Sequence, residues 1–157
     1  MTAAETVSLR PAEPRDRELV FAWRNDPFIL ARGSTRRNVG PAEHQAWFAA
    51  TLSNADRRLW IASVGTEPAG LIRFDREPAD AAVLSVYLVE RFCGRGLGVA
   101  AIREGARLAF AAWPIAKIIA FVRTDNEGAR RAFVRAGFAP ELVENCPSAH
   151  AALVLRR

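Results

Sequence analysis

The sequence has few of the residues that define several common protein classes. It holds two cysteines and two histidines in 157 residues, too few for a disulfide framework or a zinc site. No stretch approaches the roughly 20 apolar residues of a membrane span. The N-terminal M-T-A-A-E-T-V-S-L-R also lacks the apolar region of a signal peptide. These absences argue against secreted miniproteins and membrane proteins, so we expect a cytoplasmic protein without a metal.

Lysine is almost absent, because Lys117 is the only one among 22 basic residues, and the formal net charge is +5. A surplus of arginine suits bidentate recognition of phosphate or carboxylate, although codon bias produces the same composition. The arginines are spread along the chain without a nucleic-acid-binding motif, so a nucleic-acid partner is not expected. The length and the 50% apolar content are typical of one soluble domain, which we expect to span residues 1–157.

The hydropathy pattern predicts an α+β protein with a mixed sheet and helices on both faces. Strand-like segments occupy residues 7–10, 59–64, 69–76, 82–89, 117–123 and 151–155. Helical periodicity begins near residues 17, 41, 98 and 125. The short spacers at 65–68 and 77–80 predict antiparallel hairpins, so three antiparallel strands precede one strand–loop–helix–strand crossover.

Local signals set the expected ends of the helices. Pro27 is expected to end or kink the first helix. The Thr124-x-x-Glu127 pattern predicts a capping box at the start of the last helix. The inner face of the helix after residue 98 is expected to consist of Val99, Ile102, Ala106 and Phe110.

A glycine-rich segment between a strand and a helix is the most informative part of the chain. Its alternating glycines allow a tight curl whose amides, with the helix N-terminus, suit a phosphate or pyrophosphate. The predicted contacts are Cys93, Gly94, Arg95, Gly96, Leu97, Gly98 and Val99, with Arg91 at the rim. No Gly-Lys-Ser/Thr follows, which excludes a Walker loop. The run from Gly96 to Ala101 also fits a G-x-G-x-x-A dinucleotide fingerprint, but four strands precede it, against the usual position of that motif.

Two motifs resemble those of the GNAT superfamily of N-acetyltransferases. The pyrophosphate loop of that family, Gln/Arg-x-x-Gly-x-Gly/Ala, aligns with Arg91-x-x-Gly94-x-Gly96 or, counted from the strand, with Cys93-x-x-Gly96-x-Gly98. The second register places cysteine where the family has glutamine or arginine. The second signature begins at Asn126 and reads N-x-x-A-x-x-x-F-x-x-x-G-F. The resemblance covers most of the chain and implies a GNAT-like fold.

The resemblance implies transfer of an acetyl group from acetyl-coenzyme A to a primary amine by direct attack. It places a backbone N–H that holds the oxyanion at Leu88 or Val89, where a bulge separates the fourth strand from the fifth. It also implies that Asn126 and Phe133 lie beside the coenzyme, with Asn126 one of the catalytic residues together with Leu88. Many family members carry a tyrosine, as general acid, where this chain has Phe133, so the single tyrosine, Tyr87, is our first candidate for that role.

No general base is evident from the sequence. The candidates are Glu90, Asp75, Glu43 and His44, but His44 lies on an apolar helical stripe and is expected to pack in the core. A lysine amine has a pKa of roughly 10.4 and an α-amine one of roughly 7.8. Deprotonation at neutral pH is therefore much easier for an α-amine, or for a sugar amine near oxygen atoms, than for lysine.

Shorter segments resemble a GNAT subgroup that acetylates amino-sugar nucleotides, and in part the N-terminal acetyltransferases of ribosomal proteins. They are W-R-N-D at residues 23–26, E-H-x-x-W-F at 43–48 and G-L-I-R-F-D at 70–75. Both acceptor classes stay open, as does a homodimer. Two alternative functions also remain: a non-catalytic sensor of acyl-coenzyme A and a dinucleotide-binding domain.

Overall fold

One mixed sheet organises residues 5–157, which the computed structural model describes. Its seven strands lie in the order β1-β2-β3-β4-β5-β7-β6. The strands are β1 (Val7–Pro11), β2 (Arg57–Val64), β3 (Glu67–Glu77), β4 (Ala81–Leu88), β5 (Lys117–Arg123), β6 (Ala139–Pro140) and β7 (His150–Arg156). The helices are α1 (Arg17–Arg24), α2 (Pro27–Arg32), α3 (Pro41–Leu52), α4 (Leu97–Ala112) and α5 (Glu127–Arg135), with short 3₁₀ turns η1 (Pro14–Asp16) and η2 (Glu90–Phe92).

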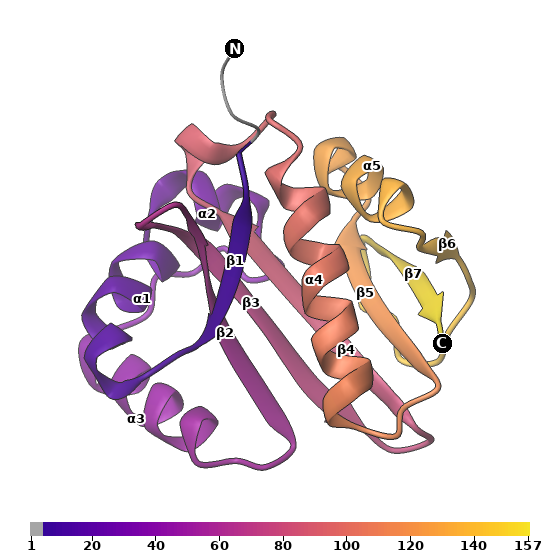
Figure 1. The fold of residues 1–157 in the computed structure, drawn as a ribbon, viewed down its shortest axis with the longest axis horizontal. Helices are drawn as coiled ribbons and strands as arrows, with labels where there is room; N and C mark the ends of the chain where they lie inside the picture. Colours follow the sequence, from indigo (N-terminus) through magenta and orange to yellow (C-terminus); the bar gives the residue numbers. More distant parts are fainter. Residues whose placement is uncertain (1–4) are drawn as a thin grey trace.

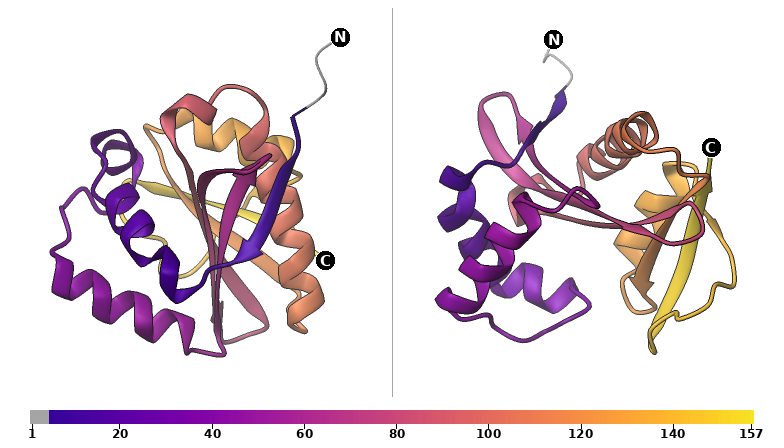
Figure 2. Two further views of the ribbon diagram at one scale, coloured as in Figure 1. Left: turned by 60° about the vertical axis from the view of Figure 1, so that its left-hand side comes forward. Right: turned by 90° about the horizontal axis from the view of Figure 1, so that it is seen from below.

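Helices cover both faces of the sheet (Figures 1 and 2), as predicted. The alternation of side chains along a strand explains the division. On β3, Ile72 and Phe74 are fully buried in the main core beneath α4 and α5. Leu71, which directly precedes Ile72 and points to the opposite face, joins the second core beneath α1, α2 and α3.

The strand pairing confirms the predicted hairpins and corrects one alternative. β2 pairs with β3, and β3 with β4, in antiparallel fashion. Within the described residues β4 and β5 form the single parallel pair, in a sheet that is otherwise antiparallel. A dinucleotide-binding domain would require a parallel sheet around residue 90, so that alternative is wrong.

The first helix ends at Arg24, before Pro27, as predicted. The sequence did not predict the helix that Pro27 begins, α2, in which the Asp26 carboxylate caps the N–H groups of Phe28 and Ile29. Two other helix details are wrong. Asn126, rather than Thr124, caps α5. The fully buried face of α4 consists of Leu97, Ala101, Ile102, Gly105, Ala106 and Ala109, whereas Val99 and Phe110 are half-buried beside it.

A half-buried ion pair fixes the chain after β1 and gives a test of stability. The Asp16 side chain is 6% exposed and accepts two hydrogen bonds from Arg10, at 2.7 and 2.8 Å. The hydrogen bonds from Arg10 hold the pKa of Asp16 below its ordinary value. A lowered carboxyl pKa stabilises the folded state at neutral pH, and this contribution disappears as the pH falls through the lowered pKa.

Asp16→Asn is therefore expected to lower the free energy of unfolding at pH 7 by about 1–2 kcal/mol, with Arg10 partly screened by water. Urea unfolding at pH 7 and below pH ~4 measures the effect, and the difference from wild type should shrink at acid pH. The control is Glu104→Gln, which breaks the exposed pair with Arg107. A pH-independent loss in Asp16→Asn would contradict this account.

Candidate functional site

β4 and β5 are paired at one end only. Ala81–Val83 lie opposite 117–119 of β5, and no further pairs join the two strands in the described sheet. β4 nevertheless remains paired with β3 up to Leu88. The two strands therefore diverge toward the end of β4 that leads into the glycine-rich loop, as Figure 1 shows.

The ladder with β3 decides which backbone groups of β4 face this divergence. The N–H of Val89 donates to the Ala69 carbonyl at 2.8 Å. Because hydrogen bonds alternate between the two edges of an antiparallel strand, the N–H groups of Leu88 and Val86 point toward β5 instead. Of the two predicted oxyanion donors, Leu88 thus has the required direction, whereas the N–H of Val89 is already used.

The bulge that the resemblance placed near Leu88 is not in β4, since the β3–β4 register is regular from Gly70 to Glu77. The irregularity lies instead between β2 and β3, at Ala62 and Ser63. The backbones of β3 and β4 approach closely near the end of β4. A Cβ atom added to Gly70 would lie 2.2 Å from the Tyr87 carbonyl oxygen. Glycine at this position therefore lets β3 hold the backbone of β4 in place.

The glycine-rich loop turns back from β4 into α4. Gly94 and Gly96 have φ angles of 74° and 77°, in the region that favours glycine, and a Cβ on either would meet no atom within 4 Å. Gly96 caps α4 without a side-chain hydrogen bond, and the first turn holds no acidic residue. The first-turn N–H groups of a helix have no intrahelical acceptor, so this end of α4 can bind an anion.

The two arginines of the loop are engaged by acids from the edge of the sheet. Arg91 pairs with Glu67 at 2.6 Å, and Arg95 pairs with Glu5. Both guanidinium groups also lie over the Phe92 ring, at 4.5 and 5.6 Å from its centroid. These pairs neutralise part of the charge that the sequence placed at the rim of the loop.

In the register counted from the strand, Cys93 aligns with the glutamine or arginine of the family motif. Its thiol lies 3.8 Å from the Leu88 carbonyl oxygen and 3.7 Å from that of Val89. Burial raises the pKa of this thiol above its ordinary value, so it stays protonated at neutral pH. The cysteine thus joins the loop to the end of β4 rather than supplying a charge.

The signature residues Asn126 and Phe133 make hydrogen bonds and packing contacts within the protein itself. The Asn126 Oδ1 accepts from the Ala129 N–H at 3.2 Å, and Nδ2 donates to the Arg32 carbonyl at 3.5 Å. Phe133 is 4% exposed in the main core, edge-on to Phe138. Both residues position α5, and the burial of Phe133 leaves little ring surface for the predicted contact with a coenzyme.

Tyr87 points to the other face of the sheet, toward α1. Its ring lies edge-on to Trp23, with centroids 6.2 Å apart. The hydroxyl oxygen is buried and has no hydrogen-bond partner within residues 5–157. Burial raises the pKa of Tyr87 far above its ordinary value, so the hydroxyl stays protonated and can donate a hydrogen bond.

Among the candidate bases only His44 is buried without an ion pair, and its Nε2 has no hydrogen-bond partner within the described residues. His44 is 2% exposed, tilted or stacked against three aromatic rings, and burial lowers its pKa, so it remains neutral as the packing residue that was predicted. Glu43 pairs with Arg37 at 2.8 Å. Asp75 pairs with two arginines, and Glu90 is exposed in η2.

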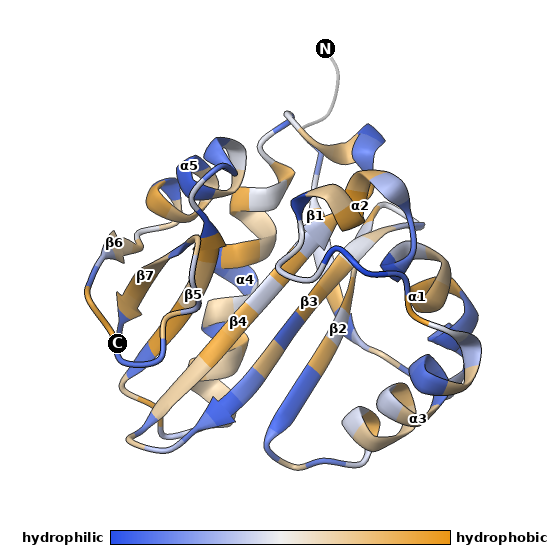
Figure 3. Cartoon of the chain, turned by 180° about the vertical axis from the view of Figure 1, so that it is seen from behind, coloured by the Kyte–Doolittle hydropathy of each residue, from blue (hydrophilic) through white to orange (hydrophobic). Residues whose placement is uncertain are grey.

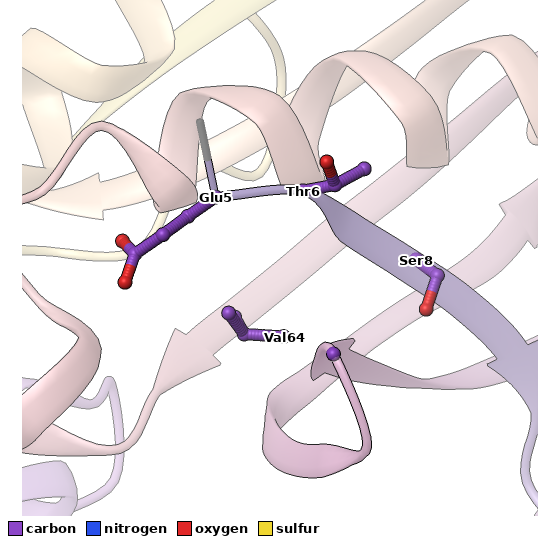
Figure 4. Close-up of a pocket in the computed structure, with 5 residues that line it drawn as sticks. Glu5, Thr6, Ser8 and Val64 are labelled. Carbon is purple, nitrogen blue, oxygen red and sulfur yellow. The ribbon is translucent and has the colours of Figure 1, made fainter. Parts of the chain in front are cut away.

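Surface hollows lie away from the diverging strands. One of about 470 Å³ lies at the β1 edge, lined by Glu5, Thr6, Ser8, Val64 and Gly65. Figure 4 shows the Glu5 carboxylate directed away from the hydroxyls of Thr6 and Ser8. In the part of the chain that the structure describes, no group of three His, Cys, Asp or Glu residues could hold a metal ion. No helix in residues 5–157 is long and apolar enough to cross a bilayer.

The diverging ends of β4 and β5 and the N-terminus of α4 both adjoin the glycine-rich loop that follows β4. The family model described as an acetyltransferase (GNAT) domain matches residues 6–139. The chain belongs to the GNAT family of N-acetyltransferases.

Solved structures with the same fold include three with coenzyme A bound. The aminoglycoside acetyltransferase AAC(6')-Ib with coenzyme A is 22% identical, with a TM-score of 0.83 over 97% of this chain and 95% of that one. Spermidine N-acetyltransferase from Vibrio cholerae, with coenzyme A and spermine, is 16% identical, with a TM-score of 0.80 over 95% and 93%. The ribosomal L7/L12 N-acetyltransferase RimL is 17% identical, with a TM-score of 0.80 over 97% and 93%. No curated protein matches the chain in sequence.

Proposed function

We propose that the chain acetylates a primary amine by direct attack on acetyl-coenzyme A held between β4 and β5. The observation that carries this proposal is the direction of the Leu88 N–H, which leaves the β3–β4 ladder and points into the divergence. A donor preorganised at this position stabilises the oxyanion that forms when the amine attacks the thioester carbonyl.

The loop supplies the other end of the coenzyme site. The pyrophosphate binds the amides that follow Gly96 at the first turn of α4, which carries no acid. The pantetheine arm then extends along β4, where its amide groups pair with the free backbone groups of Val86 and Leu88. This arrangement brings the thioester carbonyl to the Leu88 N–H.

The acceptor amine enters from the side of the sheet opposite α4, on the face of β4 that carries Tyr87. Because the candidate bases are paired, buried or distant, the site suits an amine that loses its proton easily. Amino-sugar nucleotides and protein N-termini both meet this requirement, and RimL is a ribosomal-protein acetyltransferase with the same fold. We favour these two acceptor classes over a lysine side chain.

Tyr87 assists the leaving thiolate by donating a hydrogen bond. A thiol pKa near ~8.5 lies well below the raised pKa of this phenol, so complete proton transfer is unfavourable. Tyr87→Phe is expected to lower kcat about three- to tenfold. It should not destabilise the fold, because the lost hydroxyl has no partner among the described residues. Steady-state kinetics and thermal unfolding measure the two effects.

Ser85→Ala is the matched control, since Ser85 carries the other hydroxyl on this face of β4 but is exposed. It should leave kcat unchanged. A normal kcat in Tyr87→Phe would assign Tyr87 to packing alone.

An acetyl-transfer screen tests the proposal as a whole. Release of coenzyme A thiol is followed with amino sugars, peptide N-termini and polyamines as acceptors. The proposal predicts thiol release that depends on an amine. Binding of acetyl-coenzyme A without thiol release for any amine would favour the non-catalytic sensor instead.

A further inference from the structure

Two cations lie near Tyr87. Arg73 lies on β3 opposite Ser85, two residues along the ladder from the pair of Leu71 and Tyr87. Arg24 ends α1 directly after Trp23, whose ring lies edge-on to Tyr87. Tyr87 directly precedes Leu88, the proposed oxyanion donor, so these cations border the place where the acceptor must lie. Figure 3 shows hydrophilic segments along β2 and β3. The acceptor side of the sheet therefore carries positive charge. Binding of a neutral amine alone would not require these cations.

Arg73 is incompletely neutralised. Its Nε lies 3.1 Å from Asp75 Oδ2, but it is buried and makes no hydrogen bond within the described residues. Asp75 is shared, because Arg57 also approaches it at 3.5 Å. One carboxylate thus serves two guanidinium groups, and a net positive charge remains. The Arg73 guanidinium lies 5.7 Å from the Trp47 ring centroid, which fixes its position further.

Arg24 is also left without a carboxylate of its own. Its Nη1 donates to the Arg37 carbonyl oxygen at 3.1 Å. Glu43 is the acid that feels the charge of Arg24, but Arg37 already holds both of its oxygens, at 2.8 and 3.2 Å. Among residues 5–157, no ion pair joins Arg24 to an acid.

Unsatisfied donors of this kind call for an acceptor from outside the protein. Buried polar atoms are normally hydrogen-bonded, and arginine matches the geometry of phosphate and carboxylate groups. We propose that Arg24 and Arg73 recognise an anionic group on the acceptor, so that the enzyme acetylates small amines that carry a phosphate or carboxylate. This inference rests on the proposed function and narrows its substrate class.

The same charges disfavour polycationic amines, since like charges brought together at a binding site oppose association. Spermine, the ligand named for the Vibrio cholerae structure, is such a polycation. The preferred charge of the acceptor should therefore differ between this protein and a polyamine acetyltransferase of the same fold.

Two matched pairs of acceptors test the inference with the full-length protein. They are glucosamine 6-phosphate against glucosamine, and the C-terminally amidated dipeptide Ser-Glu against amidated Ser-Gln, with spermidine as the polycation. The anionic member of at least one pair should have a kcat/KM at least tenfold higher, and added salt should reduce the preference. The pair that shows it distinguishes phosphate from carboxylate.

Arg73→Gln should raise KM for the preferred anionic acceptor at least fivefold and leave kcat/KM for its neutral partner within twofold. Arg73→Lys, which keeps the charge, should restore part of the preference. The control is Arg76→Gln, on the same strand but on the opposite face, with a similar side-chain exposure of 35%. This substitution should leave kcat/KM unchanged for both the anionic and the neutral acceptor.

Each outcome has a distinct meaning. Thiol release with equal or better use of the neutral amines and spermidine would overturn the anionic acceptor and leave the proposed function intact. No thiol release with any amine, in protein that still binds coenzyme A, would overturn the proposed function itself. An equal loss for anionic and neutral acceptors in Arg73→Gln would show that Arg73 acts on the fold rather than on the acceptor.

Discussion

Replacing the Leu88 peptide N–H by an ester oxygen, through incorporation of leucic acid, is expected to lower kcat by about a hundredfold or more. The substitution keeps the side chain and removes one donor. Stability should change little, because the Leu88 N–H has no partner on β3. Pre-steady-state acetyl transfer at saturating acetyl-coenzyme A isolates the chemical step, and thermal unfolding verifies the fold.

The equivalent ester at Val89 is the matched control. It removes the hydrogen bond to the Ala69 carbonyl oxygen, so it should lower the free energy of unfolding by about 1 kcal/mol while kcat is retained. The two esters are one residue apart and have opposite expected effects. Equal kcat values for the Leu88 ester and wild type would show that this N–H does not stabilise the oxyanion.

Coenzyme binding should depend equally strongly on the glycine-rich loop. The double substitution Gly94→Ala and Gly96→Ala is expected to weaken coenzyme A binding about a hundredfold, because a side chain in the left-handed region costs about 1–2 kcal/mol at each position. The loop then relaxes to negative φ angles and its amides turn away from the pyrophosphate. Titration calorimetry with coenzyme A measures the dissociation constant.

Gly65→Ala provides a control with the same backbone strain at a distance from the loop. Gly65 has a φ angle of 60°, and a Cβ there would also meet no atom within 4 Å. Its substitution should lower stability by about 1 kcal/mol and leave the affinity for coenzyme A unchanged. Similar losses of affinity in both variants would mean that the effect comes from general destabilisation.

Most of the fold could be predicted because it is encoded in local patterns. The alternating residues of β3 and the short spacers of the two hairpins specify the antiparallel strands. α2 escaped prediction because its six residues are too few for helical periodicity to emerge, and β6 has only two. The start of α5 was misplaced because Thr124 and Asn126 are both good capping residues.

Only the parts of the candidate site that lie within one short segment could be predicted from the sequence. The positive φ angles of Gly94 and Gly96 follow from the glycine pattern itself. The choice between Leu88 and Val89 depends on the β3–β4 register, which no single segment encodes. The role that we propose for Arg24 could not be predicted, because Arg24 in α1 is distant in sequence from Tyr87 in β4, and the packing of distant segments leaves no local signal.

Thermal unfolding with increasing acetyl-coenzyme A tests most directly whether the strand divergence and the loop form a coenzyme site. The account predicts a concentration-dependent rise in melting temperature, equivalent to about 2.7 kcal/mol at a ligand concentration of 100 Kd, and no comparable rise with NAD. An unchanged melting temperature at millimolar acetyl-coenzyme A would contradict it.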